Sequence, residues 1–401
     1  MTAPAPVGVP LPTVPSSAGS TGSPSGPAAG PSLGRAELDT LLAARAAALR
    51  TGDRAALLGG SAPGAAEAQA ALLGRTAGVP FAELAYRVGP SFTEPGPQAV
   101  SASVAVELAF RLAGVDDYPA VLQRKVDLVR DGGRWLVAGE EPVGSAALWD
   151  LGGTVRTASG KRCLVLGVAD ADALGEVAGL ADRAVPAVGE VWGAGWGGHL
   201  LLELAETEEQ FARLLDVPAD TYRGIAAVTL AMAGAPVRTP ADRVLVNPEA
   251  YRDLSELGRR VVVTHEATHV ATRADTRAWT PLWLSEGVAD WTAYRESGRT
   301  ARQIAPELAA EVRAGRVPTA LPDDAAFAAG AAGIAQAYEM SWLACDLVAR
   351  QYGGATRLVA LYRAVAAAGA GQLEKAFRTE LGIGVAEFTR QWAKDLTARL
   401  G

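Results

Sequence analysis

Two of the chain's three histidines, His265 and His269, stand four residues apart in the stretch VVVTHEATHVAT, residues 261–272. Four residues are about one turn of an α-helix, so both imidazoles project from the same face and can bind one ion. Glu266 lies about 100° around the helix from His265, where its carboxylate can reach a water on the metal as a general base. Zinc favours neutral imidazole, and a catalytic zinc keeps one position for water beside three protein ligands. The alternative is an apolar helix with two core histidines and an incidental glutamate.

The segment PLWLSEGVADW, residues 281–291, supplies two carboxylates, Glu286 and Asp290, on one helical face among large apolar side chains. Burying such carboxylates without partners is costly, whereas a zinc ion and a zinc-bound imidazole would satisfy them. We expect Glu286 to be the third zinc ligand. We expect Asp290 to accept a hydrogen bond from the non-metal N–H of a ligand histidine, which fixes the tautomer of that ring. The alternative is an acidic stripe that faces water.

The combination of HExxH with a downstream helix of the form WL(N/S)EG(hydrophobic)A resembles the gluzincin metallopeptidases, which include thermolysin-like enzymes and zinc aminopeptidases. This resemblance implies one catalytic zinc ion on His265, His269 and Glu286, with Glu266 as general base and proton shuttle. Sixteen residues separate His269 from Glu286, fewer than in the aminopeptidases, which predicts a tighter connection. The matched motifs span residues 224–353, and the general layout extends the resemblance to about residues 150–400.

Tyr338 lies in the segment AYEMSWLACDLVARQYGG, which is similar to the aminopeptidase segment whose tyrosine points at the scissile carbonyl. The similarity implies that Tyr338 donates a hydrogen bond to the developing oxyanion. Ser341 stands where those enzymes usually have glycine, and a core tyrosine at a helix start is the alternative. The remaining histidine, His199, stands at the start of an expected strand, where we expect a structural role and no metal ligation.

The segment GIAAVTLA, residues 224–231, has the size and position of the edge strand that pairs with an extended peptide in this clan. Gly224, Ile225, Ala226 and Ala227 are therefore candidate substrate-binding residues. The segment lacks the Gly-x-Met-Glu-Asn pattern, whose glutamate grips the free amine of a substrate in the aminopeptidases. This difference favours an endopeptidase over an aminopeptidase.

The elements that must position these residues fall into three parts. Residues 1–33 are rich in Pro, Gly, Ser and Ala and predict a disordered tether. Residues 34–145 predict a small α+β accessory module, with helices first and then strands of period two and a hairpin at residues 131–133. This module loosely resembles the cone-shaped fold of nuclear transport factor two. Residues 146–401 predict a gluzincin-like peptidase domain of the α+β class, in which a mixed sheet precedes a mostly helical C-terminal half.

Charge and composition limit partners and location. The formal net charge of −7 gives no support to nucleic-acid binding, and no apolar run is long enough to span a bilayer. Cys163 and Cys345 are expected to be buried free thiols, with one bridge left open if the protein is exported. The N-terminus lacks the pattern of a signal peptide. The tether nevertheless suggests an exported or surface protein, with a cytoplasmic location as the alternative.

The sequence therefore predicts a zinc-dependent peptidase that acts on a peptide or protein substrate. One alternative is a non-catalytic zinc-binding, peptidase-like protein that serves as a binding or scaffold module. Another is a metal-independent helical scaffold. The substrate sequence and the oligomeric state are left open.

Overall fold

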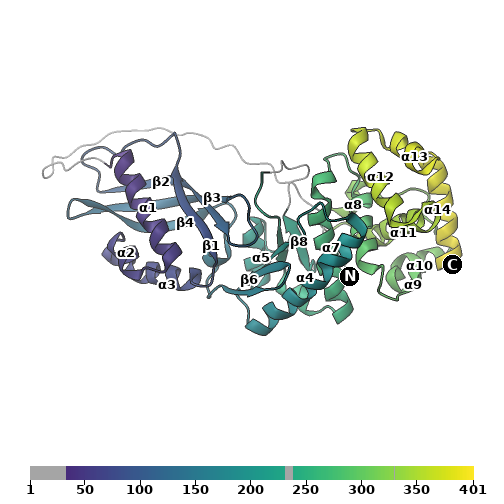
Figure 1. Cartoon of the computed structure of the whole chain (residues 1–401), viewed down its shortest axis with the longest axis horizontal. Coiled ribbons are helices and arrows are strands. Elements are labelled where there is room, and N and C mark those ends of the chain that lie inside the picture. Colours follow the sequence, from purple (N-terminus) through teal and green to yellow (C-terminus); the bar gives the residue numbers. More distant parts are fainter. Residues whose placement is uncertain (1–32, 231–237, 329) are drawn as a thin grey trace. The chain divides into compact units, whose positions relative to one another are not determined.

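The computed structural model describes residues 33–230, 238–328 and 330–401 (Figure 1). The chain divides into two compact units. The N-terminal unit comprises the described residues up to Arg156 together with Arg213–Asp216, and the C-terminal unit comprises Thr157–Ala212 and Val217–Gly401. The expected tether lies outside the described residues, except for Leu33, which is buried in the core of the N-terminal unit.

The N-terminal unit contains three α-helices, two short 3-10 helices and four strands in its described residues, all with defined bounds. These elements are α1 (Arg35–Thr51), α2 (Arg54–Gly59), η1 (Pro63–Ala65), α3 (Ala66–Thr76), β1 (Phe81–Val88), β2 (Ser101–Leu112), β3 (Ala120–Asp131), β4 (Arg134–Val143) and η2 (Leu148–Asp150). The strands form an antiparallel sheet in the order β1-β2-β3-β4. Gly132 and Gly133 form the two-residue turn of the predicted hairpin with φ angles of 55° and 83°, which glycine adopts readily.

The core of the N-terminal unit forms where α1 packs on this sheet. Leu38 and Leu42 of α1 cluster with Val104 and Val106, which alternate along β2 as the period of two predicts. The unit continues to Arg156, beyond the expected boundary at residue 145. Residues beyond 145 belong to this unit because the ring of Trp149 packs on its strands, 5.2 Å from the rings of both Phe81 and Phe110.

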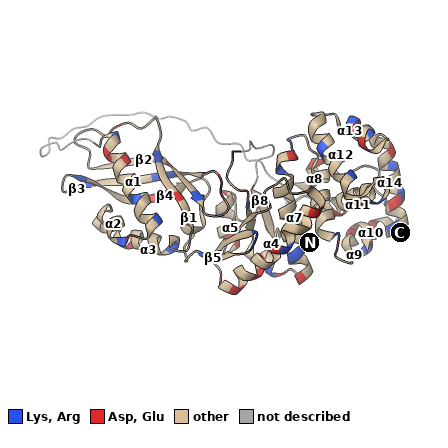
Figure 2. Cartoon of the chain, viewed as in Figure 1, with Lys and Arg blue, Asp and Glu red and all other residues tan. Residues whose placement is uncertain are grey.

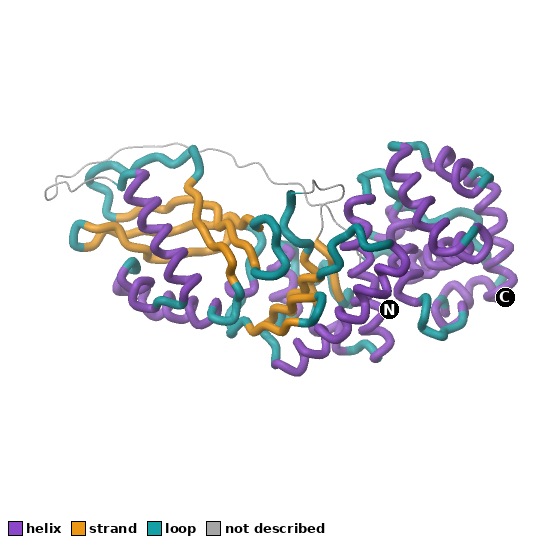
Figure 3. Tube along the Cα trace, in the orientation of Figure 1, coloured by secondary structure: helices purple, strands orange, loops and turns teal. Residues whose placement is uncertain are grey.

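The C-terminal unit begins with a mixed sheet and continues almost entirely as helices (Figure 3). Its elements are β5 (Arg156–Ser159), β6 (Cys163–Gly167), α4 (Ala171–Trp192), β7 (Leu200–Leu204), α5 (Glu208–Leu215), β8 (Ala227–Leu230), β9 (Arg243–Val246), α6 (Pro248–Arg252), α7 (Glu256–Thr272), η3 (Arg273–Asp275), α8 (Leu282–Tyr294), α9 (Ala301–Ile304), α10 (Pro306–Arg313), η4 (Asp324–Phe327), α11 (Ile334–Tyr352), α12 (Gly354–Ala368), α13 (Leu373–Leu381) and α14 (Val385–Leu400). The predicted α+β class, with a mixed sheet followed by a mostly helical half, is confirmed.

The second sheet has the strand order β5-β6-β7-β9-β8. Strands β6, β7 and β9 run parallel, and β8 pairs antiparallel with β9 at the end of the sheet. Helix α7 contacts α4, α8 and β8, and α8 contacts α11. Helix α7, which carries His265, Glu266 and His269, therefore lies against β8 at the end of the sheet, α8 packs on α7, and α11 packs on α8.

The two cysteines, Cys163 and Cys345, are buried and free. Basic and acidic side chains are interspersed along the C-terminal helices (Figure 2). No helix in the described ranges is both long enough and apolar enough to cross a membrane.

Candidate metal centre

Helix α7 begins at a local cap that its sequence supplies. The Ser255 hydroxyl accepts a hydrogen bond from the backbone N–H of Gly258 at 3.2 Å, which satisfies one of the free donors of the first turn. Val261 and Val262 are buried one turn before His265 and anchor the helix in the core. His265 is fully buried, whereas the side chain of His269 is 12% exposed. The helix thus holds one imidazole rigidly and leaves the second at an accessible edge.

The structure brings His265, His269 and Glu286 together across α7 and α8. The two Nε2 atoms lie 3.0 Å apart. Oε2 of Glu286 lies 3.2 Å from Nε2 of His265 and 3.4 Å from Nε2 of His269. One potential ligand atom from each of the three residues falls within 4.8 Å of the others. Two nitrogens and one carboxylate oxygen are a donor set suited to zinc.

Asp290 fixes the orientation of the His265 ring. Its Oδ1 atom lies 2.8 Å from Nδ1 of His265. A carboxylate only accepts, so Nδ1 is the donor and the lone pair of a neutral ring lies on Nε2, the atom that faces His269 and Glu286. Burial by itself lowers the pKa of His265, but Asp290 and Glu286 outweigh it and hold this pKa well above its usual range. The pocket therefore favours a positive charge at Nε2.

Glu286 provides a test of whether a cation fits. The residue is fully buried; its Oε1 has no hydrogen-bond partner among the described residues, and its Oε2 faces the two imidazole nitrogens at 3.2 and 3.4 Å. Burial raises the pKa of Glu286, but His269 and His265 lower it to about 2 overall, so the carboxylate is ionised. A buried carboxylate beside two imidazole nitrogens is costly unless a cation compensates it. The three side chains thus fit a divalent metal ion.

Glu266 extends from α7 toward the strand β8. It is 1% exposed. The Thr229 hydroxyl on β8 donates a 2.6 Å hydrogen bond to Oε2 of Glu266, while Oε1 has no partner in the described part of the chain. Thr229 thereby orients the carboxylate and leaves one oxygen available. Sequence reasoning missed Thr229, and the only available signal was its place within the expected edge strand.

Tyr338 lies near the start of α11 and faces the same centre. It is 3% exposed, and its hydroxyl has no hydrogen-bond partner among the described residues. Its ring packs 5.3 Å from that of Phe327 and 6.3 Å from that of His265. Burial, followed by the charges of Glu286, Asp290 and Glu266, raises the pKa of Tyr338 well above its usual range. The phenol therefore stays protonated and can donate a hydrogen bond.

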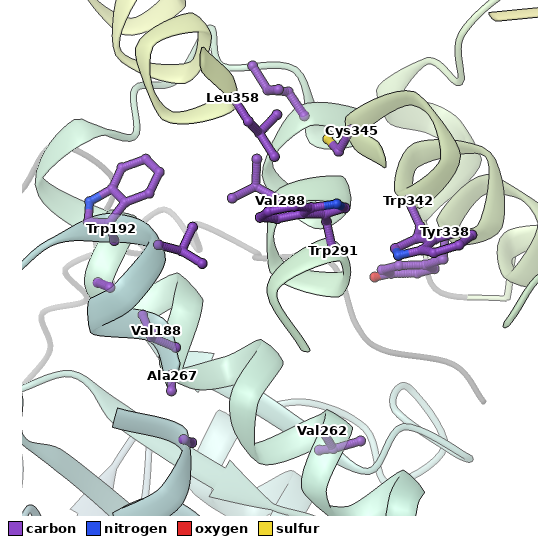
Figure 4. Packing of buried hydrophobic residues seen from close by; sticks show 14 of the residues in the cluster. Val188, Trp192, Val262, Ala267, Val288, Trp291, Tyr338, Trp342, Cys345 and Leu358 are labelled. Atoms are coloured by element: carbon purple, nitrogen blue, oxygen red, sulfur yellow. The ribbon is translucent and has the colours of Figure 1, made fainter. Parts of the chain in front are cut away.

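Close packing of α8 against α11 sets the position of Glu286 relative to Tyr338. A Cβ atom on Gly287 would lie 2.5 Å from the carbonyl oxygen of Ser341 and 2.7 Å from Sγ of Cys345. Ser341 turns its hydroxyl back to the carbonyl of Ala337 at 2.6 Å, within its own helix. Figure 4 shows the same interface, with Val288 and Trp291 on one helix and Tyr338, Trp342 and Cys345 on the other. Glycine at position 287 is thus required by the close approach of the two helices.

A cavity of about 280 Å³ adjoins this centre, and His265, Asp290 and Tyr338 form part of its wall. Val261, Val262 and Trp342 add apolar surface. The carboxylate of another lining residue, Glu339, accepts hydrogen bonds from the backbone N–H groups of Leu308 and Glu307 at 2.6 and 3.3 Å. A cavity that combines apolar surface with fixed polar groups beside a candidate metal centre is typical of a ligand site.

The other candidates from the sequence, His199 and residues 224–227, are not members of the group of three potential ligands. His199 is exposed just before β7 and does not join the His265, His269 and Glu286 group. Gly224, Ile225 and Ala226 precede β8, and Ala227 is its first residue. Ile225, Ala226 and Ala227 are all buried, whereas Gly224 is exposed. Strand β8 is the last strand of its sheet, but the role of these four residues in substrate binding stays a prediction.

No protein-family model matches the sequence, and no curated protein matches it. Solved structures similar to the chain include an alanine mutant of a two-domain M1 zinc metallopeptidase bound to L-arginine, with 15% identity and a TM-score of 0.35. The match covers 74% of this chain and 61% of that one. A mutant M1 zinc metallopeptidase from Deinococcus radiodurans is also similar, with 15% identity, a TM-score of 0.36, and coverage of 73% and 61%. The chain thus spans about 61% of the length of both structures.

Proposed function

We propose that the C-terminal unit is a zinc-dependent peptidase. The observation that carries the proposal is the convergence of one potential ligand atom each from His265, His269 and Glu286 within 4.8 Å. The buried Glu266 Oε1 and Tyr338 hydroxyl, neither with a partner among the described residues, add the two groups that hydrolysis needs. Structural metal sites have closed ligand sets and no use for a base, whereas hydrolytic sites need one.

His265, His269 and Glu286 would hold the ion through two imidazole nitrogens and one carboxylate oxygen. A zinc ion bound there supplies Lewis acidity, which lowers the pKa of a water toward neutrality and polarises a peptide carbonyl. Asp290 holds the His265 ring so that Nε2 faces the other donors. The chain thus provides a preformed set of donors, because each is fixed by helix packing or by a hydrogen bond.

Glu266 and Tyr338 are the groups that handle protons and charge in this proposal. The carboxylate of Glu266, oriented by Thr229, takes a proton from the attacking water and later delivers it to the leaving amine. The Tyr338 hydroxyl donates a hydrogen bond to the oxygen of the former carbonyl, where negative charge develops. Both side chains are almost fully buried, so these interactions operate in a region where water competes little.

A non-catalytic zinc-binding protein is the second candidate, and Glu266 distinguishes the two. Oε1 of Glu266 is buried without a hydrogen bond to any described residue, which destabilises the folded protein. A purely structural zinc site would have no functional reason to retain such a group.

Internal peptide bonds are the favoured substrates, because residues 224–231 lack the pattern whose glutamate binds a free amine. Strand β8 at the end of its sheet is the proposed docking edge for an extended peptide.

Replacing Glu266 with Gln tests the proposal. We expect the variant to keep its zinc, measured by elemental analysis, and to cleave peptides roughly 10²–10⁴-fold more slowly than the wild type. The assay uses a library of peptides with blocked N-termini and a matched library with free N-termini. Glu256→Gln is the control, because it makes the same change at an exposed position of α7. Undiminished turnover in the Glu266 variant refutes the assignment, and a wild type that binds zinc but cleaves neither library supports the non-catalytic alternative.

A further inference from the structure

The N-terminal unit contains a cavity of about 180 Å³ that the sequence did not predict. Side chains from α1, α3, β1, β2, β4 and η2 line it, so it lies between the helices and the sheet of this unit alone. Interiors of small domains are normally close-packed, and cavities larger than a few waters are uncommon in them. A cavity of this size is therefore unusual for a small domain.

Its lining includes a buried ionic network. Arg45 is 4% exposed and donates hydrogen bonds to Glu140 Oε2 at 2.9 Å and to Gln69 Oε1 at 2.7 Å. Tyr86 donates a 2.7 Å hydrogen bond to the same oxygen of Glu140. These groups come from α1, α3, β1 and β4, which join the two layers of the unit.

A second arginine, Arg124, joins the network without being part of the cavity lining. Arg124 is 1% exposed; its Nη1 lies 2.8 Å from Asp150 and its Nε lies 3.6 Å from Glu140. Nη2 of Arg45 also lies 2.9 Å from Oε2 of Glu140 as an ion pair. Arg45 and Arg75 line the cavity with Glu140 and Asp150, and Arg124 contacts both carboxylates from outside the lining. Counted together, the cavity and its immediate surroundings carry an excess of one positive charge.

Arg75 of α3 is the donor best placed for a ligand. Its Nε atom donates a 2.6 Å hydrogen bond to the carbonyl oxygen of Trp149, which fixes the plane of the guanidinium group in the lining of the cavity. Its two terminal nitrogens donate to no other described residue. The pair of parallel N–H groups left on a fixed guanidinium matches the geometry of a carboxylate.

The rest of the lining is apolar and partly aromatic. Phe81, Leu84, Leu108 and Trp149 contribute side chains, and the rings of Phe81 and Trp149 pack edge to face at 5.2 Å. Apolar walls with a small number of fixed polar groups are the usual composition of small-molecule sites. Stability alone does not account for the network, because apolar residues often replace a buried ion pair without loss of stability.

We propose that this cavity binds a small organic monoanion, whose carboxylate pairs with Arg75 and whose apolar body packs against Phe81 and Trp149. The excess positive charge selects the anion, and the aromatic wall selects an apolar or ring-shaped body. The N-terminal unit is then a ligand-sensing or ligand-binding module. This role is independent of peptidase chemistry in the C-terminal unit.

Calorimetric titration of the full chain with benzoate and with hexanoate tests the proposal, and benzamide and benzylamine serve as neutral and cationic counterparts. We expect saturable binding of at least one of the two carboxylates and none of benzylamine. Benzamide should bind at least tenfold more weakly than benzoate, because it has no charge to pair with Arg75. Failure of both carboxylates to bind at millimolar concentration, or equal binding of benzamide, overturns the proposal.

Two variants locate the binding site. Arg75→Gln should weaken carboxylate binding at least tenfold, whereas Arg54→Gln, at an exposed arginine of α2 away from the cavity, should not. Ala68→Phe places a large side chain in the cavity lining at an exposed position of α3, where folding tolerates it, and should also abolish binding. Ala71→Phe, exposed on the same helix but outside the lining, is its control. Unchanged binding in the Arg75 and Ala68 variants places the anion elsewhere and contradicts the assignment.

Discussion

Nδ1 of His265 lies 2.8 Å from Oδ1 of Asp290, although the two residues stand on different helices and 25 positions apart. This hydrogen bond decides which nitrogen of His265 is available. It leaves Nε2 directed at His269 and Glu286, at 3.0 and 3.2 Å. The electrostatics of the centre therefore depend on a residue that is not itself one of the three potential ligands.

Asp290→Asn should weaken zinc binding by about 10- to 100-fold. The amide keeps an oxygen that can accept from Nδ1, but it loses the negative charge that supports the imidazole. Competition with a fluorescent chelator measures the zinc affinity. Glu296→Gln is the control, because its side chain is 76% exposed just after the end of α8. Equal affinity in wild type and Asp290→Asn would show that the carboxylate does not support a metal ligand.

Gly287→Ala should destabilise the C-terminal unit by about 1–3 kcal/mol, because the new methyl group would clash with the backbone of α11. The nearest atom is the Ser341 carbonyl oxygen, only 2.5 Å from the added Cβ, and backbone cannot move aside as a flexible side chain can. Thermal unfolding measures the effect. Gly175→Ala in α4 is the matched control, since its Cβ would meet no atom within 4 Å. A Gly287 variant as stable as wild type would contradict the close packing of α8 and α11.

Glu339 should make stability depend on pH. Burial raises the pKa of its carboxyl from 4.5 to about 7, against the opposing effect of the backbone N–H groups of Leu308 and Glu307. The folded state therefore binds this proton more tightly than the unfolded state. Its contribution to stability is fully present below about pH 4.5 and is lost as the pH rises through about 7.

Denaturant unfolding of wild type and Glu339→Gln between about pH 5 and about pH 8 measures this contribution. We expect the wild type to lose more stability than the variant over this interval, because glutamine does not titrate. Glu296→Gln provides the control for loss of an exposed carboxylate. Stability curves that stay parallel for wild type and Glu339→Gln would mean that Glu339 titrates normally.

Local patterns in the sequence were sufficient to predict the elements that hold the centre. The spacing of His265 and His269 and that of Glu286 and Asp290 each place two side chains on one face of a helix, which is a short-range property. The fold class followed in the same way, from periods of two and of about four along the chain. That the two helix faces meet was expected from the carboxylates among apolar side chains and from the resemblance, and the structure supports it through distances of 3.2 and 3.4 Å.

Contacts between distant positions could not be predicted. Thr229 orients Glu266 across 37 residues, and a threonine in a strand carries no local sign of such a partner. Arg45 and Glu140 meet across 95 residues, so no local pattern indicated an ionic network in the N-terminal unit. The boundary at residue 145 was placed at the end of a strand pattern, whereas Trp149 continues the core by packing on Phe81 and Phe110.

The metal content of the purified chain tests the central claim most directly. After dialysis against zinc-free buffer, elemental analysis should find about one zinc per chain in the wild type and in Glu266→Gln. His265→Ala and Glu286→Gln should each lose most of it, because the remaining two donors hold zinc weakly. Circular dichroism checks that these variants stay folded. A folded wild type without zinc after reconstitution, or full zinc content in either ligand variant, would contradict the assignment of the metal centre.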